Sequence, residues 1–288
     1  MEGVTRREAL TTGGLVIAAS ALASGSQTQP SGPAVTRGRL KQSVSRWCYG
    51  KIPMPEFCKA VKGMGLTAID LLEEPEWTVV RDFGLICSMA YAGGGTIADG
   101  LNVKANHDAI VKNFEEKIPR AAKLSIPNVI TFFGNRRGMS DAEGTANCIE
   151  GLNRVKKIGE DAGVTICVEL LNSKVDHKDY MGDHTAFGVA IVKAVNSPRV
   201  KLLYDAYHMQ IMEGDLIRTL RANKDWIAHV HTGGVPGRHE LDDTQEVTWK
   251  AIASTLVEMG FTGYMAHEFV PTRDPLTSLR EAVVLCDV

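Results

Sequence analysis

Residues 200–205 read Val-Lys-Leu-Leu-Tyr-Asp, an almost continuous apolar run that ends in a carboxylate. A run of this length and composition is typical of a parallel β-strand that helices cover on both faces. Further β-rich runs follow one another along the chain from about residue 44 onward. The predicted strands span residues 44–48, 67–72, 85–89, 128–133, 164–170, 200–205, 226–231 and 263–268.

The segments between these runs carry apolar residues at helical spacing. Ile149, Leu152, Val155 and Ile158, for example, share one face of a predicted helix. Strands that alternate with helices in this way over about 245 residues predict the α/β class and a single (β/α)8 TIM barrel. A doubly wound open sheet is the alternative, but residues 48–53, after the first strand, lack its glycine-rich phosphate fingerprint.

Three consecutive glycines, at residues 93–95, follow the third predicted strand. They do not have the spacing of a dinucleotide-binding fingerprint. We therefore expect a mobile loop here rather than a phosphate-binding site.

The beginning of the chain predicts an export leader. Paired arginines at 6–7 precede a short apolar stretch at 13–23, which ends in the small-residue sequence Ala-Leu-Ala. This pattern favours a twin-arginine signal peptide at 1–23, followed by a flexible linker at 24–43 and a catalytic barrel domain at 44–288. A Sec signal or an uncleaved anchor is the alternative. We expect an exported protein, periplasmic or extracellular, with no stable membrane insertion after the leader is removed, because the apolar stretch is too short.

Composition excludes several classes of partner and site. The 288-residue chain is 44% hydrophobic and 23% charged, with a formal net charge of −2, as is ordinary for a soluble globular protein. The absence of a Lys/Arg-rich run argues against nucleic acid as a partner. The six cysteines form no Cys-x-x-Cys pair, so we expect buried free thiols rather than a thiolate zinc site.

Four consecutive predicted strands end in residues that can bind a metal: Glu169, Asp205, His231 and Glu268. The carboxyl ends of barrel strands carry the active site, and neighbouring strands lie about 4.8 Å apart. A single acid at a strand end often caps a helix, but that explanation does not suit a set of four. Three buried carboxylates are costly unless a cation compensates them. The set therefore predicts a divalent metal ion, with Mn²⁺, Mg²⁺ or Co²⁺ favoured and Zn²⁺ also compatible.

Two further residues follow these strand ends closely. His208 comes three residues after Asp205, and Arg238 comes seven residues after His231. A loop histidine and a surface arginine are the ordinary explanations. Beside a metal carboxylate, however, His208 could donate to a substrate hydroxyl, and Arg238 could contact a substrate oxygen from a loop above the barrel mouth.

The same segments resemble a known family. The stretches that carry the resemblance are Glu169-Leu-Leu-Asn172, Asp205-Ala-Tyr-His208-Met-Gln-Ile-Met-Glu-Gly-Asp215, Val235-Pro-Gly-Arg-His-Glu240 and His267-Glu268. They are similar to hydroxypyruvate isomerases, which belong to the xylose-isomerase-like barrels and have the ketose 3-epimerases as close relatives. The resemblance extends from about residue 44 to the end of the chain.

The resemblance implies a role for each site residue. Glu169, Asp205, His231 and Glu268 would bind the metal, and Glu169 and Glu268 would also exchange protons with the substrate carbon. His208 and Arg238 would hold substrate oxygens. Hydroxypyruvate isomerases often have glutamine in the place of His231, whereas histidine there is the epimerase pattern. The familiar members are cytoplasmic, so the leader is a second departure.

The sequence thus predicts a divalent-metal-dependent isomerase or epimerase of a small sugar or hydroxy-ketone, acting through an enediolate. One alternative is a metal-dependent dehydratase or lyase acting on a keto-sugar or keto-cyclitol, which needs the same intermediate. Another is a non-catalytic carbohydrate-binding barrel. Relatives are often dimers or tetramers, so a homo-oligomer remains open.

Overall fold

The computed structural model describes residues 32–288. The predicted leader, residues 1–23, and residues 24–31 of the predicted linker lie outside the described residues. Among residues 32–288, no helix is both long enough and apolar enough to cross a membrane.

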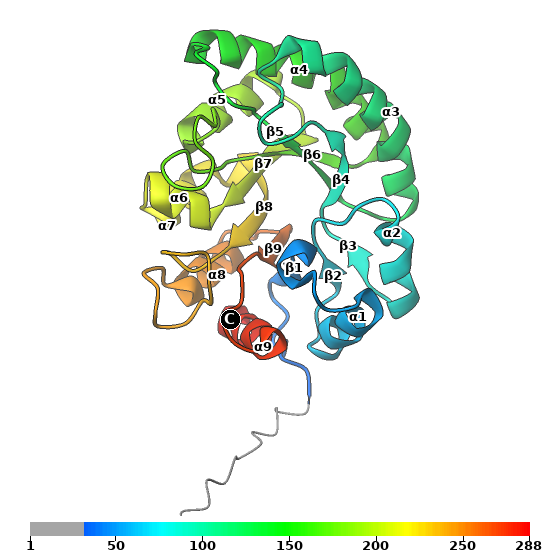
Figure 1. Ribbon diagram of the computed structural model, residues 1–288, viewed down its shortest axis with the longest axis vertical. Coiled ribbons are helices and arrows are strands. Elements are labelled where there is room, and N and C mark those ends of the chain that lie inside the picture. The colour runs from blue at the N-terminus through cyan, green and yellow to red at the C-terminus, as the bar shows by residue number, and fades with distance from the viewer. Residues whose placement is uncertain (1–31) are drawn as a thin grey trace, which may run out of the picture. The chain divides into compact units, whose positions relative to one another are not determined.

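Parallel strands form the inner layer of the fold, and helices lie around the outside (Figure 1). The larger sheet has seven strands in the order β1-β9-β8-β7-β6-β5-β4, and β2 pairs with β3 in a second sheet. Single bridges, Ser45 with Asp70 and Leu72 with Ala90, join the two sheets into one barrel. The strands are β1 (Lys41–Val44), β2 (Ala68–Ile69), β3 (Ile86–Cys87), β4 (Ala90–Gly94), β5 (Asn128–Phe132), β6 (Thr165–Glu169), β7 (Val200–Asp205), β8 (Ile227–Thr232) and β9 (Tyr264–His267).

Helices separate the strands, except that β3 and β4 follow one another directly, and both lie beside the segment of β2, so that they occupy one strand position. The prediction of a single (β/α)8 barrel is thus confirmed. Helix α4 illustrates why they form where they do. Ser140 accepts a hydrogen bond from the backbone N–H of Glu143, and the helix ends at Gly163, whose φ of 71° is left-handed. The helices are α1 (Met54–Gly63), α2 (Glu76–Val79), α3 (His107–Lys123), α4 (Asp141–Ala162), α5 (Thr185–Val195), α6 (Ala206–Met212), α7 (Leu216–Asn223), α8 (Trp249–Glu258) and α9 (Pro275–Cys286).

The barrel begins earlier than predicted. Strand β1 occupies Lys41–Val44, whereas residues 46–48 of the strand predicted at 44–48 belong to a 3-10 helix at 46–49. Residues 32–43, assigned from the sequence to the flexible linker, are part of the described fold: the Asp287 carboxylate accepts hydrogen bonds from the backbone N–H groups of Thr36 and Gly38. The polar composition of β1 concealed it, because Gln42 is buried and paired with His267 and the Val283 carbonyl.

The glycines at 93–95 are not the mobile loop that the sequence suggested, because Gly93 and Gly94 belong to β4. The Thr131 hydroxyl donates to the Gly94 carbonyl oxygen at 2.6 Å. A Cβ on Gly94 would lie 2.5 Å from the Ile130 carbonyl oxygen and 2.8 Å from the Phe114 ring. Glycine is therefore required here for the close approach of a helix and a strand to the backbone.

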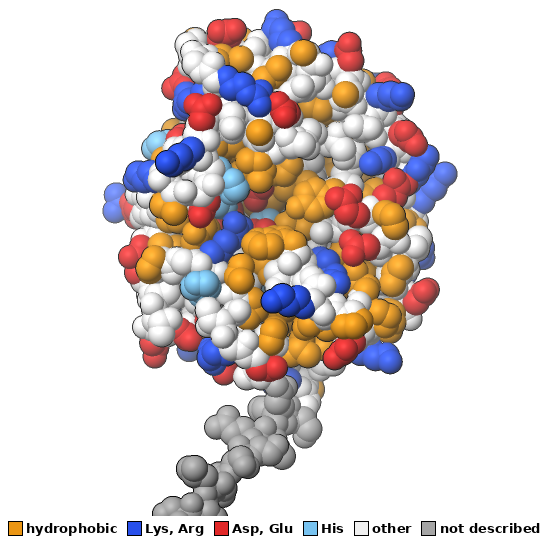
Figure 2. Space-filling model, in the orientation of Figure 1, with side chains coloured by type: hydrophobic (Ala, Val, Ile, Leu, Met, Phe, Trp, Pro, Cys, Tyr) orange, Lys and Arg blue, Asp and Glu red, His pale blue; other side chains and the backbone are white. Residues whose placement is uncertain are grey.

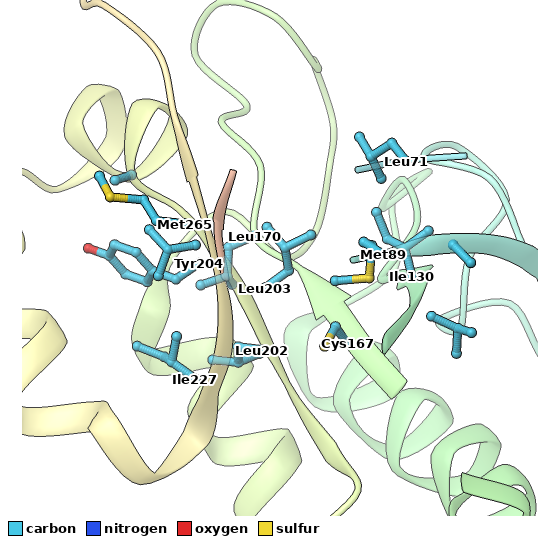
Figure 3. Close-up of a cluster of buried hydrophobic side chains, with 14 of the residues drawn as sticks. Leu71, Met89, Ile130, Cys167, Leu170, Leu202, Leu203, Tyr204, Ile227 and Met265 are labelled. Carbon is cyan, nitrogen blue, oxygen red and sulfur yellow. The ribbon is translucent and has the colours of Figure 1, made fainter. Parts of the chain in front are cut away.

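The core lies inside the barrel and between the strands and the helices. Ile130 of β5, Cys167 of β6 and Leu203 of β7 are among its buried side chains (Figure 3). All six cysteines are free and five of them are buried, with Cys48 half-buried, which confirms the expectation of unpaired thiols.

Candidate metal and active site

The four predicted metal ligands lie at the carboxyl ends of four neighbouring strands. Glu169 and Asp205 are the last residues of β6 and β7, His231 is the penultimate residue of β8, and Glu268 directly follows β9. Asp205 and His231 are register partners across the β7–β8 pair. The strand order β9-β8-β7-β6 therefore sets the four side chains along one arc of the barrel mouth.

The structure brings these side chains together. Ligand atoms of all four lie within 4.8 Å of one another, and all four residues are buried. The Nδ1 atom of His231 lies 3.4 Å from Glu169 Oε1, 3.9 Å from Asp205 Oδ2 and 2.7 Å from Glu268 Oε2. The imidazole thus lies among the three carboxylates.

The donor set fits a divalent cation. Three carboxylates and one imidazole are an oxygen-rich set that Mn²⁺, Mg²⁺, Co²⁺ or Zn²⁺ can accept. His231 Nδ1 is buried and faces all three carboxylates, with Glu268 Oε2 nearest at 2.7 Å. A buried ring nitrogen among three carboxylate oxygens is an arrangement of donor atoms that suits a divalent cation.

Arg238 supplies positive charge to this cluster. Its Nη2 atom lies 3.1 Å from Asp205 Oδ2 and 2.5 Å from Glu268 Oε2, and its guanidinium lies over the rings of Trp47 and Tyr207. The loop after β8 therefore does bring Arg238 into the site, as predicted from its sequence position.

Burial and neighbouring charges shift the pKa values of the three acids in different directions. Burial raises the pKa of Asp205 to about 7, although the Arg238 charge acts against it. Burial also raises the pKa of Glu169. Burial also acts to raise the pKa of Glu268, but the charges of Arg238 and His231 hold that pKa well below the usual range. Glu268 is thus the most firmly ionised of the three carboxylates.

His208, the other predicted substrate contact, is fully buried beside the cluster. Its Nε2 atom lies 3.5 Å from Asp205 Oδ2 and has no hydrogen-bond partner. Its Nδ1 atom lies 2.6 Å from Asn172 Nδ2. The Asn172 side chain is oriented by the backbone N–H groups of Val175 and Asp176, which donate to its Oδ1. Asn172 therefore donates to Nδ1 of a neutral imidazole, so the Nε2 proton of His208 faces the site.

Sequence reasoning missed two contributors. The indole Nε1 of Trp47 donates to Glu268 Oε1 at 2.5 Å. Asp70, which follows β2, lies 2.9 Å from His231 Nε2. The only sequence signal for Asp70 was an acid inside the apolar run at 67–72; Trp47 gave none, because its segment was predicted as strand.

Three further histidines, His107, His177 and His184, lie outside the metal cluster. His107 is buried, with Nε2 2.7 Å from the Leu101 carbonyl oxygen. His177 is half-buried and its ring centroid lies 5.2 Å from that of His208, at the edge of the site. His184 is exposed.

The mouth of the barrel forms a hollow in the surface. Histidine, basic and acidic side chains gather in this hollow, and hydrophobic side chains surround it (Figure 2). Trp47 is 46% exposed, which leaves an aromatic surface beside the Glu268 carboxylate. The arrangement suits a small polar ligand with some apolar surface.

Several known proteins are similar to this chain in sequence. A Xenopus laevis protein assigned as a hydroxypyruvate isomerase is 29% identical over 146 residues, which cover 51% of this chain and 53% of that protein. The 2-oxo-tetronate isomerase of Cupriavidus necator is 31% identical over 126 residues, 44% of this chain and 48% of that enzyme. The D-psicose 3-epimerase of Ruminiclostridium cellulolyticum is 31% identical over 124 residues, 42% and 39% of the two chains. The chain thus spans about half the length or less of these relatives.

A solved structure is similar over more of the chain. A protein of Brucella melitensis described as an AP endonuclease of family 2 has a TM-score of 0.74 and 21% identity. The similarity covers 83% of this chain and 97% of that protein, and at this identity it shows the fold alone.

A family model described as the xylose isomerase-like TIM barrel matches residues 77–285, well over half of the chain. The match includes the four clustered residues Glu169, Asp205, His231 and Glu268 as well as His208 and Arg238. The chain therefore belongs to the xylose isomerase-like TIM barrel family.

Proposed function

We propose that this protein is a divalent-metal-dependent isomerase or epimerase of a small sugar or hydroxy-ketone. The observation that carries the proposal is the buried cluster of Glu169, Asp205, His231 and Glu268 at the carboxyl end of the barrel. The similar isomerases and the similar epimerase support the same reaction class.

The four clustered side chains would hold the metal ion. A divalent cation bound there would supply Lewis acidity, which makes the proton next to a substrate carbonyl easier to remove. The donor set does not select one metal, so we leave Mn²⁺, Mg²⁺, Co²⁺ and Zn²⁺ as candidates.

Two carboxylates would move the proton. Glu169 ends β6 and Glu268 follows β9, with β7 and β8 between these strands, and we propose that they flank the substrate. One removes the proton as general base and the other returns a proton. Return to the same carbon from the opposite side inverts that carbon, whereas return to the neighbouring carbon interconverts aldose and ketose.

The neighbouring donors would hold the substrate oxygens. The Nε2 proton of His208 faces the site, and the guanidinium of Arg238 reaches both Asp205 and Glu268. Donors aimed at an oxygen that gains negative charge stabilise the transition state more than the ground state. The indole of Trp47 restricts the orientation of Glu268 through its hydrogen bond.

The test is proton exchange with solvent. Metal-loaded protein is incubated in D₂O with a panel of ketoses and with hydroxypyruvate, and products and deuterium incorporation are followed by NMR. We expect product formation with deuterium at one carbon, and loss of both in Glu169→Gln and Glu268→Gln. Glu258→Gln, on an exposed ion pair with Arg221, is the matched control and keeps full activity.

Two other outcomes of this experiment would indicate a different function. A product with a conjugated carbonyl that absorbs in the ultraviolet would indicate a dehydratase or lyase. Ligand binding without turnover or exchange across the whole panel would contradict catalysis and favour a carbohydrate-binding protein.

We also propose that the protein is exported by the twin-arginine route. The supporting observation is the sequence pattern at residues 6–23, with paired arginines before a short apolar stretch. Replacement of Arg6 and Arg7 by lysine should retain the full-length protein in the cytoplasm, as measured by fractionation. Unchanged export would contradict the proposal.

A further inference from the structure

Asp70 is a fully buried carboxylate that the proposed reaction does not use. It follows β2, and it forms a parallel bridge with Ser45 after β1. Its side chain meets groups from two other parts of the barrel. The Ser88 hydroxyl donates to Oδ1 at 2.5 Å, and Nε2 of His231 lies 2.9 Å from Oδ2. Nε2 of His229 lies 3.2 Å from Oδ1.

An ionised carboxylate only accepts hydrogen bonds. The short contact between Asp70 and His231 therefore requires the proton to be on Nε2 of that imidazole. In a neutral ring the other nitrogen, Nδ1, then carries the lone pair. Nδ1 is the atom that faces Glu169, Asp205 and Glu268.

We propose that Asp70 is a positioning residue that fixes the tautomer and the ring orientation of His231, so that Nδ1 is presented to a divalent cation. The proposal rests on the metal site of the proposed function. The Asp70 carboxylate also contacts the hydroxyl of Ser88, which follows β3, and the ring of His229 in β8. A carboxylate hydrogen-bonded to the far nitrogen of a metal-binding histidine raises the metal affinity of the site.

The decisive variant is Asp70→Asn, which keeps the size and shape of the side chain. Its amide nitrogen can donate to Nε2 of His231 and so favours the tautomer with the proton on Nδ1. That proton would have to leave before a cation could bind. We expect the affinity of the metal-depleted protein for Co²⁺ and Mn²⁺, measured by calorimetric titration, to fall about 10–100-fold.

Ser88→Ala is the matched control. It removes the hydrogen bond that Ser88 donates to the Asp70 carboxylate but leaves the contact between Asp70 and His231 intact. We expect metal affinity close to wild type in this variant, and a circular dichroism spectrum and cooperative melting like wild type in both variants. A drop in affinity as large in Ser88→Ala as in Asp70→Asn would overturn the proposal.

A second measurement does not depend on bound metal. In metal-free protein labelled with ¹⁵N-histidine, NMR correlation spectra at a pH where the ring is neutral report which nitrogen of His231 carries the proton. We expect the proton on Nε2 in the wild type and on Nδ1 in Asp70→Asn. The wild-type proton on Nδ1, or the same tautomer in both proteins, would overturn the proposal. The NMR test of the His231 tautomer remains decisive even if the protein binds no metal and the proposed function fails.

The number of metal ions bound per chain distinguishes a positioning role of Asp70 from a second metal site. Asp70, His229 and His231 form a second group whose ligand atoms lie within 4.8 Å of one another. If these residues bound a cation of their own, the wild type would hold two ions per chain, and His229→Gln would lose one. One ion per chain, retained in His229→Gln, agrees with a positioning role for Asp70.

Discussion

Replacement of Arg238 by methionine tests how the buried charges are balanced. The guanidinium is 15% exposed and lies 3.1 Å from Asp205 Oδ2 and 2.5 Å from Glu268 Oε2. Removing one partner of a buried ion pair costs about 3–5 kcal/mol, because the other charge remains buried without compensation. At about 2–4 °C per kcal/mol for a domain of this size, the metal-free variant should melt about 6–20 °C below the wild type.

A bound divalent cation supplies positive charge to the same carboxylates. The difference in melting temperature between Arg238→Met and wild type should therefore shrink when Mn²⁺ is saturating. Calorimetric melting with a chelator and with Mn²⁺ gives both values. Activity should be low in both conditions, because the guanidinium is also the proposed contact for a substrate oxygen.

Arg273→Met is the matched control for this prediction. Arg273 contacts two exposed carboxylates, Asp242 at 3.0 Å and Glu281 at 2.8 Å, and lies 3.8 Å from Glu240, but its side chain is 45% exposed. Exposed ion pairs contribute about 0–1 kcal/mol. If metal-free Arg238→Met melts no lower than Arg273→Met, the Arg238 guanidinium does not compensate the buried charge of Asp205 and Glu268.

Three further predictions concern single side chains. Asn172→Leu should lower kcat more than metal affinity, because it removes the donor that fixes His208 as an Nε2–H donor; equal loss of metal binding would contradict that role. Burial acts to raise the pKa of Glu240, but donated hydrogen bonds lower it to about 2. Its contribution, about 1 kcal/mol after allowance for solvent, should be present above pH ~4.3 and lost towards pH 2. The unfolding free energies of wild type and Glu240→Gln should therefore converge over that window, and a constant difference would refute it. Gly182→Ala should destabilise the fold by about 1–3 kcal/mol in chemical denaturation, because its Cβ would overlap the buried Phe133 ring; unchanged stability would show that the ring can move.

The fold could be predicted from the sequence because most strands are apolar runs. Residues 200–205 were placed correctly to the residue, since burial on both faces leaves little room for polar side chains. Strand β1 was misplaced, because Lys41, Gln42 and Ser43 look like linker until their partners are known. Gln42 is buried only because His267 and the Val283 carbonyl, more than two hundred residues away, satisfy its amide.

The candidate site could be predicted as far as its residues follow strands directly. Glu169, Asp205 and Glu268 stand at strand ends, and parallel strands bring such ends together at one edge of the barrel. Asp70 and Trp47 could not be assigned in this way. Their roles depend on which side chains face them across the barrel, and local pattern carries no information about that.

The proposed function depends most directly on whether Glu169, Asp205, His231 and Glu268 bind a metal ion. Elemental analysis of the purified folded chain, after equilibration with Mn²⁺, Mg²⁺, Co²⁺ and Zn²⁺ and removal of free ions, measures this beside the Glu169→Ala/Glu268→Ala double variant. We predict about one divalent ion per wild-type chain and none in a double variant that still melts cooperatively. An absence of bound metal in the wild type, with no thermal stabilisation by any of these ions, would contradict a metal-dependent function.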